Sequence, residues 1–274
     1  MIASPLTTPV HAAGAAFDRL ATVYDNKFTD TLIGRAQRNA VWRVIAQAFR
    51  SGDHILELNC GTGEDAFFLA GKGVSVVACD ASEQMIEYAQ QRLRAEAPTT
   101  SVKFAQLPIE QITKIRTEDT FNGIFSNFSG LNCVADLSQT AEDLATFIPP
   151  GAPLIICLST RFCISEIIWF LIHGRPHEAF RRCSGHAAAK VGEFVVDVYY
   201  PTLRQLQKSF SPAFVMRSCV GIGITVPPSY VEPWIRKFPN LLHVMETIDK
   251  ALSACPGFRV IGDHMLISFE RVQV

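Results

Sequence analysis

The chain has 274 residues, of which 48% are hydrophobic and 19% are charged, and its formal net charge is −1. This composition fits one large domain or two small ones with a sizeable core, and it excludes an intrinsically disordered chain. Because no basic excess is available to hold a phosphate backbone, nucleic acid is not expected as a partner.

The cysteines and the apolar stretches indicate the compartment. The eight cysteines form no C-x-x-C pair and no spacing typical of a zinc site, so we predict reduced thiols and no metal. The start of the chain lacks the basic and apolar regions of a signal peptide. The most apolar stretch, 153–172, is interrupted by Arg161 and Glu166 and therefore indicates a buried strand and helix, not a membrane span. We expect a cytoplasmic protein.

The first 50 residues predict a mobile start followed by helical structure. Residues 1–16 contain small residues and prolines, which are typical of an unanchored terminus. Residues 31–49 predict an amphipathic helix, because their apolar residues recur with helical spacing. Its inward positions are Leu32, Ile33, Val41, Trp42, Ile45 and Phe49.

Residues 54–85 predict half of a nucleotide-binding βαβ unit. A glycine-bearing turn joins the first strand to a helix, and glycines let the backbone approach a ligand where a Cβ would clash. The N-terminus of the helix offers unpaired N–H groups to that ligand, and Asp80 ends the second strand, where a carboxylate can accept ribose hydroxyls. In chain order, the strand, turn, helix and second strand occupy 55–58, 59–63, 64–71 and 74–79.

The turn resembles motif I of the class I S-adenosylmethionine (SAM) dependent methyltransferases. Its pattern is E-x-N-x-G-x-G, where the family commonly has E/D-x-G-x-G-x-G. Residues 80–91, DASEQMIEYAQQ, are similar to the segment after the family's second strand, and residues 17–25, FDRLATVYD, resemble its N-terminal helix. Asn59 stands at the first glycine of the motif, and asparagine tolerates left-handed backbone better than most residues. Within this class, the chain resembles the small type 11 methyltransferases.

The rest of the chain continues the α/β alternation and then departs from it. After the fifth strand, residues 161–200 hold an apolar helix (164–172), a basic segment, a Gly/Ala-rich stretch and an alternating run (193–200). Class I methyltransferases commonly build a substrate cover here, although a purely structural elaboration explains the same residues. The remaining expected helices are 83–95, 136–147, 202–210 and 234–252, and the remaining strands are 101–105, 152–159, 214–220, 263–271 and one within 121–132.

The resemblance implies an α/β fold with a Rossmann-like, doubly wound, seven-stranded sheet. Helices would lie on both faces, the last strand would insert antiparallel between the fifth and the sixth, and a cover would follow strand five. The expected segments are a mobile N-terminus (1–16), N-terminal helices over the cofactor (17–50), the SAM-binding core (51–160), the inserted substrate cover (161–212) and a C-terminal part completing the sheet (213–274).

The resemblance also implies a set of residues that bind SAM and its product, S-adenosyl-L-homocysteine. Tyr24 would contact the methionine end of SAM, and Arg38 either meets the SAM carboxylate or is an exposed helix arginine. Pro108 aligns with the family's adenine-binding aspartate, so adenine would depend on backbone near Ile109. The full set is Tyr24, Arg38, Glu57, Asn59, Cys60, Gly61, Gly63, Asp80, Ala81, Met85, Leu107, Pro108, Ile109, Ser126, Asn127 and Phe128.

No catalytic side chain is implied, because methyl transfer mainly requires alignment of the reacting atoms and exclusion of water. A general base is needed only when the nucleophile must lose a proton. Asn127, His173 and Tyr200 are weak catalytic candidates, and a structural role is open for each. Further candidate bases or substrate holders are His177, His186, Asp197, Tyr199, Tyr230 and His264.

We therefore predict a SAM-dependent methyltransferase that acts on a small, apolar acceptor by in-line displacement. The apolar residues of 164–170 suggest an apolar or lipid-like acceptor, although core packing explains them equally well. Two alternatives remain: an NAD-dependent oxidoreductase, which uses the same βαβ logic, and a non-catalytic SAM-binding protein.

Overall fold

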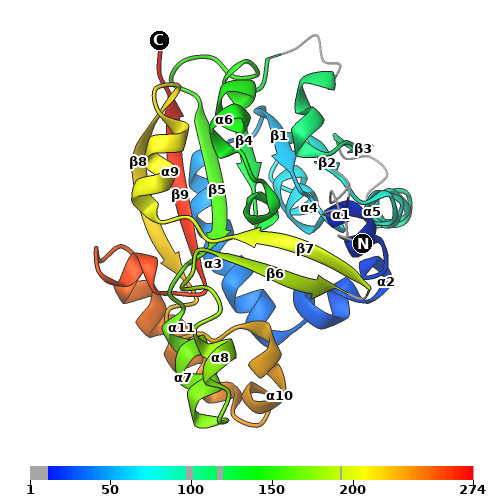
Figure 1. Ribbon diagram of the computed structural model, residues 1–274. Helices are drawn as coiled ribbons and strands as arrows, with labels where there is room; N and C mark the ends of the chain where they lie inside the picture. Colours follow the sequence, from blue (N-terminus) through cyan, green and yellow to red (C-terminus); the bar gives the residue numbers. More distant parts are fainter. Residues whose placement is uncertain (1–11, 97–100, 116–119, 192, 274) are drawn as a thin grey trace, which may run out of the picture.

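The computed structural model describes residues 12–96, 101–115, 120–191 and 193–273. Its centre is a seven-stranded sheet with the order β3-β2-β1-β4-β5-β9-β8 (Figure 1). The first five strands are parallel, whereas β9 runs antiparallel to both β5 and β8. The expected fold class is confirmed, including the antiparallel last strand. The strands are β1 (His54–Leu58), β2 (Ser75–Asp80), β3 (Val102–Gln106), β4 (Gly123–Ser126), β5 (Pro153–Ser159), β8 (Phe214–Ile222) and β9 (His264–Arg271).

Helices cover both faces of this sheet. One core lies between the sheet and helices α3 (Leu32–Ala48), α4 (Glu64–Ala70) and α5 (Glu83–Glu96). The other core includes α6 (Leu137–Ala145) and α9 (Leu203–Phe210). In β1, Ile55 packs into the first core and Leu56 and Leu58 into the second, because successive strand side chains point to opposite faces. Strands that are apolar on both faces are typical of such doubly covered parallel sheets.

The segment after β5 forms two helices and a separate two-stranded hairpin. The helices are α7 (Ile164–Ile172) and α8 (Pro176–Ala179), and the hairpin strands are β6 (His186–Val191) and β7 (Phe194–Tyr199). In Figure 1 the hairpin crosses the carboxyl-end side of the sheet and reaches α1, which packs against β7. The Gly/Ala-rich stretch was not expected to be a strand, and β6 forms there because it pairs along its whole length with β7.

Two predicted helices are divided in the structure. The N-terminal region consists of α1 (Ala12–Asp18), α2 (Ala21–Tyr24) and a π-helical turn (Asp25–Thr29), so helical structure begins before residue 17. Residues 1–11 lie outside the described residues. The expected helix 234–252 is wrong as one element, because α10 (Glu232–Ile235) ends before α11 (Pro239–Leu252) and a proline cannot continue a preceding helix. Short 3-10 helices occupy Ile109–Lys114, Gly130–Cys133, Ser229–Val231 and Phe258–Val260.

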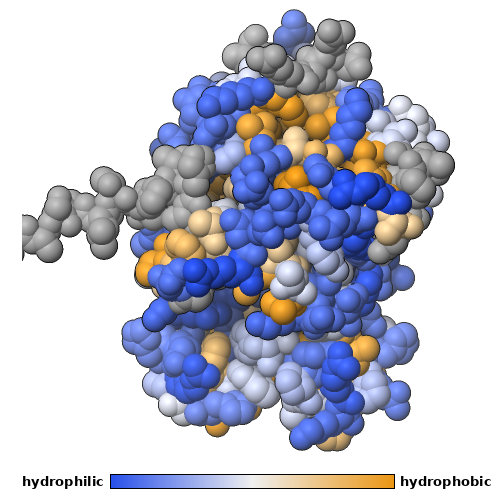
Figure 2. Space-filling model, turned by 90° about the vertical axis from the view of Figure 1, so that its right-hand side faces the viewer, coloured by the Kyte–Doolittle hydropathy of each residue, from blue (hydrophilic) through white to orange (hydrophobic). Residues whose placement is uncertain are grey.

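The surface mixes polar and apolar residues. On the face shown in Figure 2, hydrophilic residues predominate, and hydrophobic ones gather in separate patches, mainly in the upper half. Within the described ranges, no helix combines the length and the apolar character that crossing a bilayer requires.

Candidate functional site

The turn after β1 combines left-handed backbone with open space. Asn59 and Gly61 both have a φ of 54°, and Gly63 has a φ of 82°. Asparagine adopts this conformation more readily than most residues, so the turn forms without a first glycine. A Cβ added to Gly61 would meet no atom within 4 Å. The backbone of this turn is therefore open to a ligand that approaches it closely.

A cavity of about 200 Å³, which we call cavity A, lies at this turn. Gly61, Asp80 and Met85 line it from the core, and Tyr24 and Phe128 line it from α2 and from the loop after β4. The cavity thus joins the carboxyl ends of three strands to the N-terminal helices, which is where ligands bind in open α/β sheets.

Asp80 is held rigidly at the edge of cavity A. Its Oδ2 accepts a hydrogen bond from the Gly61 N–H, and its Oδ1 accepts one from the Ser82 N–H, each over 2.9 Å. Burial raises the pKa of this carboxyl, while the backbone N–H donors oppose the shift. Each carboxylate oxygen retains acceptor capacity beyond these bonds, so Asp80 can still accept hydroxyl donors from a ligand.

A smaller cavity of about 40 Å³, cavity B, continues from the same turn and shares four of its lining residues with cavity A. Arg38 lines cavity B and is buried, with its Nη1 2.6 Å from Oδ2 of Asp65. Burial lowers the pKa of Arg38, but the Asp65 carboxylate and Tyr24 outweigh it and the net shift is upward. Asp65 is also bound by Trp42 and Asn127. The Nε of Arg38 is buried without a hydrogen-bond partner, which leaves a cationic donor at this end of the site.

Hydrogen bonds to two carboxylates, those of Asp18 and Asp25, hold the N-terminal helices over cavity A. Asp18 accepts hydrogen bonds from the Ser82 hydroxyl over 2.6 Å and from the Gln84 N–H over 3.1 Å. The Thr62 hydroxyl donates to Asp25 over 2.7 Å. Neither aspartate was among the residues expected at the site, although both lie within the segment FDRLATVYD that resembles the family's N-terminal helix. The hydrogen bonds of Asp18 and Asp25 place α1 and α2 as a cover that can exclude water.

The structure brings together ten of the residues expected to bind the cofactor and leaves six away from the cavities. Glu57 is buried beneath the turn with its Oε2 unpartnered, and burial, aided by Asp65, raises its pKa well above the usual value. Gly63 packs against Phe104, so that a Cβ there would clash. Lining cavity A or B are Tyr24, Arg38, Asn59, Cys60, Gly61, Asp80, Ala81, Met85, Asn127 and Phe128, whereas Glu57, Gly63, Leu107, Pro108, Ile109 and Ser126 line neither.

A third cavity of about 370 Å³, cavity C, lies on the other side of Tyr24 and Phe128. These two aromatic residues line cavities A, B and C alike. Polar residues from the insertion, from the 3-10 helix Ser229–Val231 and from the start of β9 face cavity C, including Arg182, Tyr230 and His264. Cavity C therefore adjoins cavity A and offers room for a second molecule.

None of the three weak catalytic candidates lines cavity C. Asn127 lines cavity B and donates to Asp65, which is a structural bond in the Arg38 network. His173 is exposed at the end of α7, with its Nδ1 2.7 Å from the Trp169 carbonyl. Tyr200 is buried against the Arg182 guanidinium.

Most of the other candidates line none of cavities A, B and C. His186 pairs with Asp197 on the exposed hairpin over 2.8 Å, Tyr199 lines a separate cavity beside α6, and His177 lies in α8. Within the part of the chain that the structure describes, no group of three or more His, Cys, Asp or Glu side chains could hold a metal ion.

Comparison with known proteins identifies what the core resembles. Residues 49–168 match the family model described as "Methyltransferase domain". A demethylmenaquinone methyltransferase of Clavibacter sepedonicus is 30% identical over 162 residues, which are 57% of this chain and 62% of that protein. The chain thus spans less than two thirds of the length of this relative.

Solved structures share the fold at low sequence identity. The DhpI–SAH complex aligns with a TM-score of 0.60 at 15% identity and covers 97% of this chain and 98% of that chain. The cyclase SpnF aligns with a TM-score of 0.60 at 10% identity and covers 97% of both chains. Because one fold hosts several chemistries, these likenesses establish the fold, and the activity must be argued from the site.

Proposed function

We propose, from the premise that this chain carries a methyltransferase domain of the class I, SAM-dependent type, that it transfers a methyl group from SAM to a small-molecule acceptor. The observation that carries the proposal is the open space at the Gly61 backbone, which we call the cradle and which lies beside the Asp80 carboxylate. Helices α1 and α2 lie over it and are held there by hydrogen bonds. A dinucleotide-binding turn commonly has a third glycine at the position of Ala66, and because that fingerprint also admits alanine, titration with NAD is the observation that separates the two cofactors.

The residues around cavities A and B fit the parts of SAM. The Asp80 carboxylate can accept the ribose hydroxyls, and the Gly61 backbone can lie against the nucleoside. Arg38, whose buried Nε lacks a partner, can neutralise the methionine carboxylate. Bound SAM supplies a methyl group activated by the positive charge of its sulfonium. The cover formed by α1 and α2 would exclude water, which favours the displacement.

The acceptor that we propose is a hydroxylated, quinone-like ring bound in cavity C. Two observations support it: the relative named demethylmenaquinone methyltransferase, and the position of cavity C across Tyr24 and Phe128 from cavity A. Phe28 and Phe128, whose ring centroids are 4.9 Å apart, give cavity C an aromatic wall against which a planar ring can pack.

The test is a transfer assay with methyl-labelled SAM and 1,4-dihydroxynaphthalene as the acceptor, with cyclohexanol for comparison. We expect label in the naphthalene product and stoichiometric S-adenosylhomocysteine, and both should vanish in Asp80→Ala at low SAM concentration. SAM binding without transfer to any member of a hydroxyarene panel would overturn the proposed activity while leaving the cofactor assignment intact.

A further inference from the structure

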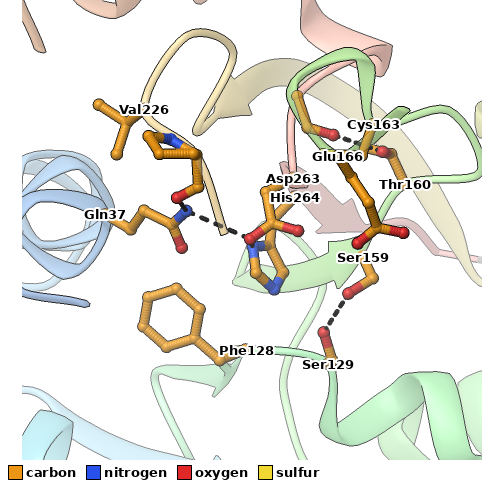
Figure 3. Close-up of polar contacts among 12 residues, drawn as sticks. Gln37, Phe128, Ser129, Ser159, Thr160, Cys163, Glu166, Val226, Asp263 and His264 are labelled. Carbon is orange, nitrogen blue, oxygen red and sulfur yellow. Dashed lines mark hydrogen bonds and ion pairs between the residues drawn. The ribbon is translucent and has the colours of Figure 1, made fainter. Parts of the chain in front are cut away.

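A buried histidine at the start of β9 faces cavity C. His264 is 7% exposed and pairs in register with Ser159, the last residue of β5. Because β9 is antiparallel to β5, its first residue lies beside the carboxyl ends of the parallel strands. Figure 3 shows the ring with one nitrogen near Asp263 and the other directed into the space between Phe128 and Ser159.

The nitrogen near Asp263 lies beside a carboxylate that is itself fixed. Nδ1 of His264 is buried without a hydrogen-bond partner, 3.5 Å from Oδ2 of Asp263. The two carboxylate oxygens of Asp263 are held by Arg182 over 2.9 Å and by Gln37 over 3.2 Å. Glu166, which Arg182 also binds, completes the buried network. The ring therefore has one side next to a fixed carboxylate and one side free to meet a ligand.

Burial of the ring favours a neutral imidazole. Burial lowers the pKa of His264, and Arg182 adds to this, while Asp263 and Glu166 oppose it. Burial alone would raise the pKa of Asp263, but the charge of Arg182 and the hydrogen bonds from Arg182 and Gln37 oppose it, and the net shift is downward. The other titratable groups that face cavity C are Tyr24, Lys27, Arg181 and Tyr230. A neutral imidazole oriented by a carboxylate can accept a proton and hold it as imidazolium.

We propose that His264 is the general base that takes the hydroxyl proton of an acceptor bound in cavity C, with Asp263 as the residue that positions it. This proposal rests on the proposed function and adds the residue that deprotonates the acceptor, whose hydroxyl must then be an acidic phenol or enol. Phenolic hydroxyls ionise near a pKa of roughly 10, within reach of an imidazole in a concerted step, whereas aliphatic hydroxyls are far less acidic.

The transfer balances with His264 as the proton acceptor. The acceptor O–H bond breaks and Nε2 takes the proton, while the electron pair of the oxygen, or of a ring carbon conjugated with it, bonds to the methyl carbon. The methyl–sulfur bond breaks and leaves its pair on sulfur. For attack from carbon, the proton of that carbon returns to the oxygen. Both routes yield the methylated acceptor, S-adenosylhomocysteine and one proton, which the imidazolium gives to solvent.

The first test needs neither SAM nor turnover. The protein saturated with S-adenosylhomocysteine is titrated with 4-nitrophenol, whose phenolate absorbs visible light, at a pH where the free probe is mostly neutral. We expect the probe bound to the wild type to be more ionised than the free probe, and H264Q to abolish this gain. H186Q is the matched control, because His186 also pairs with an aspartate but lies on the exposed hairpin. A bound probe that stays neutral in the wild type overturns the proposal without recourse to any variant.

The second test uses the rate of methyl transfer to 1,4-dihydroxynaphthalene. H264Q should lower kcat by about 10²–10⁴-fold while the calorimetric affinity for SAM is unchanged, since His264 lines neither cavity A nor cavity B. Asp263→Asn should move the midpoint of the pH–rate profile to lower pH, and Asp263→Glu should restore it. Unchanged turnover in H264Q would contradict only the role of His264 as the general base. Absence of SAM binding in the wild type would contradict the proposed function itself.

Discussion

The backbone N–H of Gly61 donates a 2.9 Å hydrogen bond to Oδ2 of Asp80, and the same glycine faces open space where a Cβ would stand. This hydrogen bond therefore joins the carboxyl ends of β1 and β2, and the cradle, the open space at the Gly61 backbone, lies beside it. The remaining site is arranged around this pair, with α1 and α2 above it and cavity C beyond Tyr24 and Phe128.

Replacing Asp80 should weaken cofactor binding without unfolding the chain. Asp80→Ala removes the acceptor expected for the ribose hydroxyls, so the affinity for SAM should fall by about 1–3 kcal/mol. Calorimetric titration measures this directly. Glu87→Gln, an exposed change on α5, is the control and should leave the affinity unchanged. Equal affinities in both variants would place the nucleoside elsewhere.

A side chain at Gly61 should fill the cradle. Gly61→Val should abolish SAM binding, and it should also cost about 1–2 kcal/mol of unfolding free energy because its φ of 54° is unfavourable for a residue with a Cβ. Gly151→Val is a matched control, since Gly151 also has positive φ and open space but lies between α6 and β5. Denaturant unfolding and calorimetry separate the two effects: retained SAM binding in Gly61→Val would exclude cavity A as the cofactor site.

Loosening the helical cover should speed the release of SAM. Asp18→Ala removes the bonds to Ser82 and Gln84, and a loss of about 1 kcal/mol corresponds to roughly fivefold faster dissociation in stopped-flow displacement. Arg19→Ala, next to it, breaks the exposed pair with Glu193 and the cation–π contact with Phe194 and should have little effect. If the two variants release SAM at the same rate as the wild type, α1 does not act as a cover.

Glu57 should make the chain less stable as the pH rises. Burial raises its pKa in the folded state, so the folded protein retains a proton that the unfolded chain has released. This contribution is complete below the unfolded pKa of about 4.3 and is lost as the pH rises toward the folded pKa, at up to about 1.4 kcal/mol per pH unit. Glu57→Gln should remove the dependence, so its advantage over the wild type in denaturant unfolding should grow from pH 4.5 to pH 8. A constant difference would mean that Glu57 is ionised in the fold.

The parts of the fold that follow from local pattern could be predicted, and those that depend on pairing could not. The apolar runs and the glycine turn specify β1, α4 and β2, and Asn59 adopts the expected left-handed backbone. The alanines of β6 carry no strand signal of their own, and β7 supplies the missing preference through its hydrogen bonds. The break between α10 and α11 was readable, because Pro239 stands inside the predicted helix.

The residues of the candidate site could likewise be predicted only where they belong to a local sequence motif. The core residues around Asp80 could be named because they adjoin one another in a short motif. His264 ranked beside several other candidates in the sequence, because only the antiparallel insertion of β9 brings it next to Ser159 and cavity C. The burial of Arg38 likewise depends on tertiary packing, because its guanidinium pairs with Asp65, which Trp42 also binds.

The central claim is that the cradle at Gly61 and Asp80 holds an adenosyl sulfonium. Calorimetric titration of the wild-type protein with SAM, S-adenosylhomocysteine and NAD tests it most directly. We expect one site that binds SAM and S-adenosylhomocysteine competitively and leaves NAD unbound. Tight binding of NAD with no heat from SAM would contradict it.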